Sequence, residues 1–470
     1  MQHNLEKKYG LLTAICLVVG AVIGSGIFFL NETVFNATGG RLYLAVLAWL
    51  IGGAIMFVMM YVWGQLAKNK EGMNGLMDFS DQLVGKTYSY FLTWFLGTIL
   101  YPSFVSVLAW VTARFTATLL GWSQPNTSGA VWMLAGVYLV GIYVINVLSP
   151  KLAGQVQVST TFIKVIPLIL MGVIGIIMGM VNGTTAENLT YVRAIEELSG
   201  NPLYLAVLAT VFAYAGAEEV LMMNSEIKDG KKNLPRAIII GSLIIVAIYV
   251  VYTIGVFGST YTETLRTPGG IRLGFENIFG NAFGSVLIVF IIISCLGAMN
   301  SAMMAGSRSF YSIALRNIGP KPDFVKEVDA KTDMPSTSAA ISLIFCGLMM
   351  LIIFANAQDY PYHIRWFGDI SIPITSLTPI TLMSFYIPIF VNVIRKETTW
   401  TPFNRFVMPG LSIAGAALLI YMVFDTNPVG AMIYLAGFAV IMGIGGVFLL
   451  TNKKETIQSS VAFSEEVLEN

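Results

Sequence analysis

The sequence has few charged residues and very little histidine or cysteine. Only 11% of its 470 residues are charged, where about 25% is usual in a soluble protein, and 56% are hydrophobic. Mean hydropathy is +0.74. The 2 histidines and 3 cysteines show no metal-ligand spacing, and no basic stripe accompanies the net charge of +1. We therefore predict a polytopic membrane protein without a metal, a cofactor or a nucleic-acid partner.

The cysteines do not form a disulfide pattern. Cys16, Cys295 and Cys346 all lie in apolar stretches, and their number is odd. We interpret them as small core residues. The first apolar stretch lacks a small-residue cleavage site and is followed by further apolar runs, so we expect a retained helix rather than a signal peptide.

Long apolar runs take up most of the chain. A membrane-spanning helix needs about 20 mostly apolar residues. The runs lie near residues 9–37, 42–67, 87–121, 129–148, 152–181, 201–227, 235–258, 282–315, 337–356, 367–394, 403–425 and 428–451. They predict an all-α membrane protein with twelve transmembrane helices in a single domain, residues 1–451. A polar, disordered cytoplasmic tail, residues 452–470, is expected to follow.

Lysine and arginine are far more frequent in the loops on one side of these helices than in those on the other. Of the 27 basic residues, twenty share the side of the N-terminus and five lie opposite. The other two, Arg114 and Lys164, fall inside spans. Because basic loops stay in the cytoplasm, both termini are expected there, in a cell membrane.

The stretch "VIGSGIFFL", residues 22–30, places weak helix formers in the middle of the first span. Opened backbone at membrane depth is tolerated where it lines a cavity, and its free N–H groups attract a carboxylate. Gly24, Ser25 and Gly26 suit such a site. They equally suit close packing of small residues against another helix. From these residues alone both interpretations remain open.

The sixth span is interrupted in the same way. It contains Ala215-Gly216-Ala217 followed by Glu218-Glu219, and a carboxylate at mid-membrane costs about 2.5–3.5 kcal/mol on insertion scales. Interrupted first and sixth helices predict two related five-helix halves with a site between them. The first span starts inside and the sixth outside, so the halves are expected to be inverted.

An ordered set of motifs resembles the amino acid–polyamine–organocation superfamily. The motifs are "GAVIGSGIF", "FAYAGAEEV", "EIKDGKKNLPRAI", "NSAMMAGSRSFYSIA" and "KTDMPSTS". "FAY-x-G" and Pro102-Ser103 are similar to the L-type amino-acid transporters. Glu218 stands where the arginine/agmatine and glutamate/GABA antiporters carry a glutamate.

The resemblance implies a LeuT-like fold and a transport function. The fold is a 5+5 inverted repeat over about 9–181 and 201–394, with broken helices 1 and 6, plus helices 11 and 12 over about 403–451. The function is sodium-independent secondary transport of amino acids by alternating access, through exchange or proton coupling. An amino-acid/amine or polyamine antiporter is the alternative. A membrane enzyme or a channel is disfavoured, because neither an acid/base constellation nor a repeated pore element is present.

The resemblance also implies the binding residues. The substrate carboxylate is expected at the main chain of Ile23, Gly24, Ser25 and Gly26. The ammonium is expected at the carbonyls of Phe212, Ala213 and Ala215. Phe212 matches an aromatic lid, although a core phenylalanine is the alternative.

Two buried charges are candidates for coupling. Lys164 resembles the lysine of sodium-independent members, where its ammonium replaces the ion and donates to carbonyls near Gly20–Ile23; snorkelling to the cytoplasm is the alternative. Glu218 exchanges a proton, pairs with a cationic substrate, or only bonds a free amide at the helix break. Glu219, about 100° away, is expected to face other protein or the lower vestibule.

Other residues carry weaker predictions. Six could line the side-chain pocket, although each is more often a packing residue: Trp94, Pro102, Ser103, Asn300, Ser371 and Thr375. Asp369 is expected to pair with Arg365 in a structural or gating role. The expected partners are an amino acid or amine, the lipid bilayer and, under coupling, protons; no accessory subunit is required.

Overall fold

The computed structural model describes residues 10–24, 26–69, 75–122, 128–148, 150–191, 201–265, 270–329, 332, 334–356 and 372–469. These residues form helices joined by turns and loops, with one isolated bridge between Asp329 and Met334. The predicted all-α class is confirmed.

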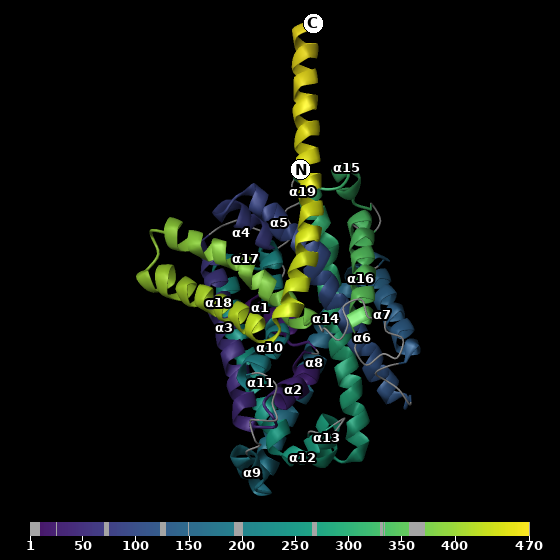
Figure 1. The fold of residues 1–470 in the computed structure, drawn as a ribbon, viewed down its shortest axis with the longest axis vertical. Helices are drawn as coiled ribbons and strands as arrows, with labels where there is room; N and C mark the ends of the chain where they lie inside the picture. The colour runs from purple at the N-terminus through teal and green to yellow at the C-terminus, as the bar shows by residue number, and fades with distance from the viewer. Residues whose placement is uncertain are drawn as a thin grey trace.

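Apolar helices of membrane-spanning length make up the bundle (Figure 1). Eleven qualify among the described residues, or twelve if the bent pair α1 (Leu11–Val22) and α2 (Gly26–Ala37) is one span. The others are α3 (Leu42–Asn69), α5–η1–α6 (Lys86–Phe95, Leu96–Leu100, Tyr101–Leu119), α7 (Gly129–Leu148), α8 (Pro150–Val181), α10 (Pro202–Tyr214) with the start of η3 (Ala217–Glu226), α11 (Gly230–Gly258), α14 (Asn281–Ala314), α16 (Ser336–Asn356), α17 (Ile374–Lys396), η4–α18 (Phe403–Val407, Met408–Thr426) and α19 (Pro428–Glu469). The chain is therefore a multi-pass membrane protein.

Short helices lie at the two ends of the bundle. α4 (Gly75–Leu83) and α15 (Pro322–Val325) lie at one end, together with the projecting part of α19. α9 (Thr184–Thr190), α12 (Thr262–Leu265) and α13 (Gly270–Phe279) lie at the other end (Figure 1). The loops that contain α4 and α15, which the distribution of lysine and arginine places on one side of the membrane, thus lie at the same end of the bundle.

The centre of the bundle is formed by the third span. Within the most apolar stretch of Lys86–Leu119, 94% of the residues are buried inside the protein. In the corresponding stretch of Pro428–Thr451, at the periphery, 11% are buried. α6 packs against α14, and α11 packs against α3 and α8. Gly172 and Gly175 of α8 meet Gly255 of α11 at backbone contact. Small residues allow this close approach, which favours helix association where lipid supplies no hydrophobic driving force.

The predicted disordered tail is wrong in one respect. α19 continues to Glu469 and projects beyond the bundle as one helix (Figure 1). The segment after Gly446 contains no glycine or proline, the residues that most often end a helix, so no local signal stops α19 at the end of its apolar part.

Candidate functional site

The first interruption separates α1 from α2. α1 ends at Val22, α2 begins at Gly26, and the helices meet at an angle of 48°. The N–H of Ile23 donates to Val19 O at 2.8 Å, and the N–H of Gly24 donates to Val22 O at 2.7 Å. Ser25 lies outside the described residues. The first amides of an α-helix have no acceptor within their own helix, so those of α2 are candidate donors to a ligand.

The second interruption follows α10. Ala215 is extended, with φ −74° and ψ 154°, and Gly216 has φ +107°, which favours glycine. The chain then enters the 3-10 helix η3. The N–H of Ala215 donates to Phe212 O at 3.3 Å. The last carbonyls of α10 therefore lose their regular helical donors at this point.

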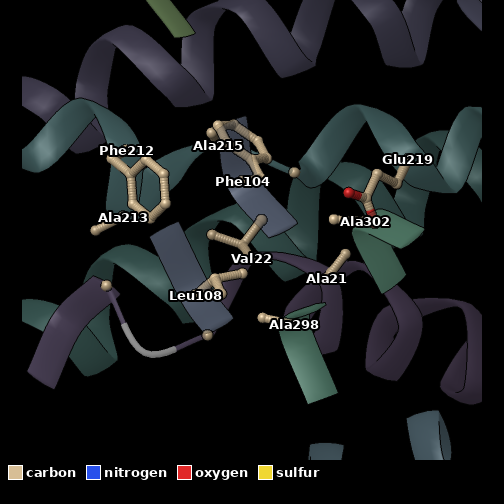
Figure 2. Close-up of a pocket in the computed structure, with 13 residues that line it drawn as sticks. Ala21, Val22, Phe104, Leu108, Phe212, Ala213, Ala215, Glu219, Ala298 and Ala302 are labelled. Atoms are coloured by element: carbon tan, nitrogen blue, oxygen red, sulfur yellow. The ribbon is translucent and has the colours of Figure 1, made fainter. Parts of the chain in front are cut away.

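The two interruptions border one small cavity (Figure 2). Apart from Glu219, the residues that line it are apolar, and most of them are alanine or glycine. It is lined by Ala21, Val22, Gly24, Gly26, Phe104, Leu108, Phe212, Ala213, Ala215, Gly216, Glu219, Ala298 and Ala302. Five predicted binding residues are thus brought together: Gly24, Gly26, Phe212, Ala213 and Ala215. Ile23 is fully buried but does not line the cavity.

The glycines of the first interruption also serve packing. A Cβ on Gly26 would lie 2.8 Å from Ala213 Cα, and one on Gly24 would lie 2.9 Å from Ala298 Cβ. Neither neighbour is a flexible side-chain end that can move aside. Gly24 and Gly26 therefore fit both predicted roles: they line a cavity that could bind a ligand, and they allow close packing between helices.

Lys164 is buried in α8 and directed toward α1. Its side chain is fully buried, and Nζ donates to Gly20 O at 2.5 Å. The sequence analysis predicts that the Lys164 ammonium donates to a carbonyl near Gly20–Ile23, and Gly20 O is such a carbonyl. The ammonium therefore does not snorkel toward the bundle end.

The adjacent glutamates face two different cavities. Glu218 is 5% exposed, and its Oε2 accepts the N–H of Gly216 at 3.2 Å. It lines a second small cavity, whose wall also contains Met56, Met59, Met60, Tyr214, Ala215, Pro379, Leu382, Met383 and Tyr386. Glu219 instead lines the first cavity, and its Oε2 accepts from Ser301 Oγ at 2.5 Å. Successive residues of a 3-10 helix are about 120° apart, which separates the two carboxylates.

Sequence reasoning therefore gave Glu219 too little weight. Among the lining residues of the first cavity it is the one ionisable side chain. The sequence places the two glutamates side by side but does not show which of them turns toward the first cavity, because that depends on how η3 packs against the other helices. The hydrogen bond of Glu218 to Gly216 is the contact that a structural role for Glu218 predicts.

Tyr249 of α11 has a position that the sequence did not indicate. Its hydroxyl lies 3.2 Å from Val22 O and 3.0 Å from Ala213 O, so it connects the ends of α1 and α10. The ring also contacts Trp49 and Tyr214. A tyrosine within an apolar run is common in a membrane helix, so no local pattern identified it.

The weaker candidates lie elsewhere. Trp94 Nε1 donates to Ile441 O at 2.9 Å, Ser103 Oγ donates to Ile99 O at 2.6 Å, and Asn300 Oδ1 accepts from Asn146 Nδ2 at 2.9 Å. These residues line neither described cavity, nor do Pro102 and Thr375. Arg365, Asp369 and Ser371 lie outside the described residues. From the third span it is instead Phe104 and Leu108 that reach the first cavity, and Phe104 packs edge-on against Phe212.

Apolar spans around a small central cavity define a multi-pass membrane protein with an internal site. The model of the amino acid permease family matches residues 9–447, so this chain belongs to that family. The resemblance read from the motifs is thereby confirmed.

Individual members of the family share low identity with the chain over most of its length. The serine/threonine exchanger SteT of Bacillus subtilis (strain 168) is 27% identical over 455 residues, covering 95% of this chain and 96% of that protein. A cystine/glutamate transporter of Pongo abelii is 22% identical over 446 residues, covering 90% and 87%. The large neutral amino acids transporter small subunit 2 of Homo sapiens is 25% identical over 370 residues, covering 76% and 68%.

Proposed function

We propose that this protein is a sodium-independent secondary transporter of amino acids that works by alternating access, through exchange or proton coupling. The observation that carries the proposal is the cavity bordered by both helix interruptions. An amino acid carries a negatively charged carboxylate and a positively charged ammonium group on the same carbon. The N–H groups at the start of one helix, beside the carbonyls at the end of another, complement that pair of charges.

The proposed architecture is a LeuT-like 5+5 inverted repeat over residues 9–181 and 201–394. In it, α1/α2 and α10/η3 are the broken first and sixth helices, and α18 and α19 stand outside the repeat. Equivalent pairs support this: α6 packs against α7 as α14 packs against α16, and α1 packs against α11 as α10 packs against α3. Residues 1–451 then form one transporter domain with both termini in the cytoplasm of a cell membrane.

In the proposed site, the substrate carboxylate binds at the start of α2. The N–H groups of Ile23 and Gly24 already have backbone acceptors, so Gly26 and the first turn of α2 are the proposed donors. Ser25, outside the described residues, stays a predicted contact. The dipole of α2 adds to the attraction for an anion. The ammonium binds at the carbonyls of Phe212, Ala213 and Ala215.

Phe212 is proposed as the lid of the site. Its ring lines the cavity and contacts Phe104 of α6 with ring centroids 5.0 Å apart, in an edge-to-face arrangement. A movement of α10 relative to α6 would separate the two rings. Substrate entry and release are thus coupled to the contact between these helices.

Lys164 is proposed to take the place of a sodium ion. A cation between α1 and α8 neutralises the carbonyl end of α1, and the bond of Nζ to Gly20 O performs this role with a covalently attached charge. Glu218 is proposed as a coupling residue, because it is a buried carboxyl beside the second interruption.

Reconstitution in proteoliposomes tests the function. Uptake and counterflow of common amino acids should proceed equally in sodium and in choline media. A strict sodium requirement would contradict the role of Lys164. Transport of polyamines in place of amino acids would favour the antiporter alternative, and binding of each class should appear as a rise in melting temperature.

A further inference from the structure

The first cavity has one ionisable side chain among its lining residues, that of Glu219, whose Oε1 lies 3.9 Å from the position that a Cβ on Gly216 would occupy. Figure 2 shows Phe212 and Ala213 on one side of the cavity and Glu219 on the other. Ala21, Ala298 and Ala302 line the space near Glu219. A substrate held at the two helix interruptions can therefore extend its side chain along an apolar wall toward a carboxylate.

One oxygen of that carboxylate remains available. Oε2 accepts from Ser301 Oγ at 2.5 Å, while no hydrogen bond from the described residues reaches Oε1. Glu219 itself is only partly buried, since it borders the cavity. A carboxylate in apolar surroundings is costly unless it is paired with a cation and fully hydrogen-bonded.

Two other charges lie nearby, and neither occupies Oε1. Lys164 interacts electrostatically with Glu219, but its Nζ bonds Gly20 O, and no ion pair joins the two side chains in the described part of the chain. Glu218 faces the second cavity and accepts from Gly216. Among the described residues, Oε1 of Glu219 is therefore the oxygen to which a cationic group of a substrate could bind.

We propose that Glu219 selects amino acids whose side chain ends in an amino group, with its Oε1 accepting from the side-chain ammonium. The methylene groups of such a side chain suit the alanine-lined wall, and the ammonium suits the carboxylate. This inference rests on the proposed function, because it assumes that the substrate backbone binds at the helix interruptions. It names the substrate class of that same site.

The first test uses the unmodified protein in proteoliposomes. Lysine or ornithine should be taken up with a higher Vmax/KM than norleucine, which has a similar carbon chain without the amine. Equal or better uptake of norleucine overturns the selectivity proposal while leaving amino-acid transport intact. Failure to transport any amino acid overturns the proposed function and this inference with it.

The second test uses Glu219→Gln, which keeps the side-chain size and the acceptor for Ser301 but removes the charge. Vmax/KM for lysine should fall about ten- to hundredfold, the range expected for losing a hydrogen bond between charged groups, while uptake of norleucine is retained. Glu219→Asp should keep the preference for lysine. An unchanged ratio of lysine to norleucine in Glu219→Gln refutes the assignment.

Two further glutamines serve as comparisons. Glu218→Gln changes the adjacent carboxylate, which lines the second cavity, and should keep the preference for lysine over norleucine. Glu187→Gln changes an exposed residue of α9 and should leave all uptake unchanged. If Glu218→Gln alone removes the preference, the wrong carboxylate has been assigned.

Discussion

At the scale of single residues, each buried charge near the cavities has a defined partner. Lys164 bonds Gly20 O, Glu218 accepts from Gly216, and Glu219 accepts from Ser301. A buried polar group without a partner costs free energy, so these contacts constrain the backbone at both interruptions. A substitution that removes one partner therefore leaves the other unsatisfied within the membrane.

Lys164→Met should abolish most amino-acid uptake. The substitution keeps an unbranched apolar side chain but leaves Gly20 O without its donor and removes the positive charge beside α1. Uptake in proteoliposomes is the measurement, and size-exclusion chromatography controls for folding. A folded variant with the parent uptake rate would contradict the role of Lys164.

Glu218→Gln separates a proton-coupling role from a structural one. Glutamine can still accept the N–H of Gly216, so the helix break is kept while the titrating group is lost. If Glu218 carries a proton, uptake by the parent rises as external pH falls, and the variant shows a flattened dependence. The same pH profile in both proteins would show that Glu218 only holds the interruption.

At the scale of elements, the contact between α2 and α10 holds the first cavity together. Gly26 of α2 lies directly against the backbone of Ala213. Both residues also line the cavity, so the width of the site depends on how closely these helices approach. The same glycine therefore determines helix packing and ligand access.

Gly26→Ala should lower both uptake and the melting temperature. The added Cβ would lie 2.8 Å from Ala213 Cα, so one helix must shift, and overpacking of this kind costs about 1–3 kcal/mol. Gly443→Ala in α19 is the matched control, because its Cβ would meet no atom within 4 Å. Lost uptake with an unchanged melting temperature would instead indicate that the methyl group only blocks the carboxylate.

At the scale of the whole molecule, the ends of the bundle correspond to the predicted sides of the membrane. α15 and α12 lie at opposite ends (Figure 1). Cys295 and Cys346 are buried, so new cysteines in the loops would react selectively once Cys16 is replaced. The orientation of the bundle is therefore open to chemical labelling.

Glu263→Cys in α12 should react with a membrane-impermeant maleimide on intact cells. Asp323→Cys in α15, whose aspartate side chain is 90% exposed, should react only after the membrane is permeabilised. The reason is that the basic loops, including that of α15, are expected in the cytoplasm. The reverse labelling pattern would invert the proposed topology.

The sequence by itself determined the class, the family and the spans. A run such as 129–148 coincides with α7, because a bilayer requires about 20 apolar residues and any sequence that crosses it must display them. The sequence also has weak helix formers, Gly24, Gly26 and Gly216, at the places where α1 and α10 end. Apolar runs and weak helix formers are properties of short stretches of sequence, so they can be recognised without knowledge of the tertiary structure.

Only the tertiary structure decided which side chains meet. The direction of Glu218 and Glu219 depends on the 3-10 path of η3, which follows from packing after Gly216 and not from the local pattern. Tyr249 joins Val22 to Ala213 across three helices. Helices of similar apolar composition can pack in many registers, so contacts between residues distant in sequence are set by complementary shape and polar pairing across the whole bundle.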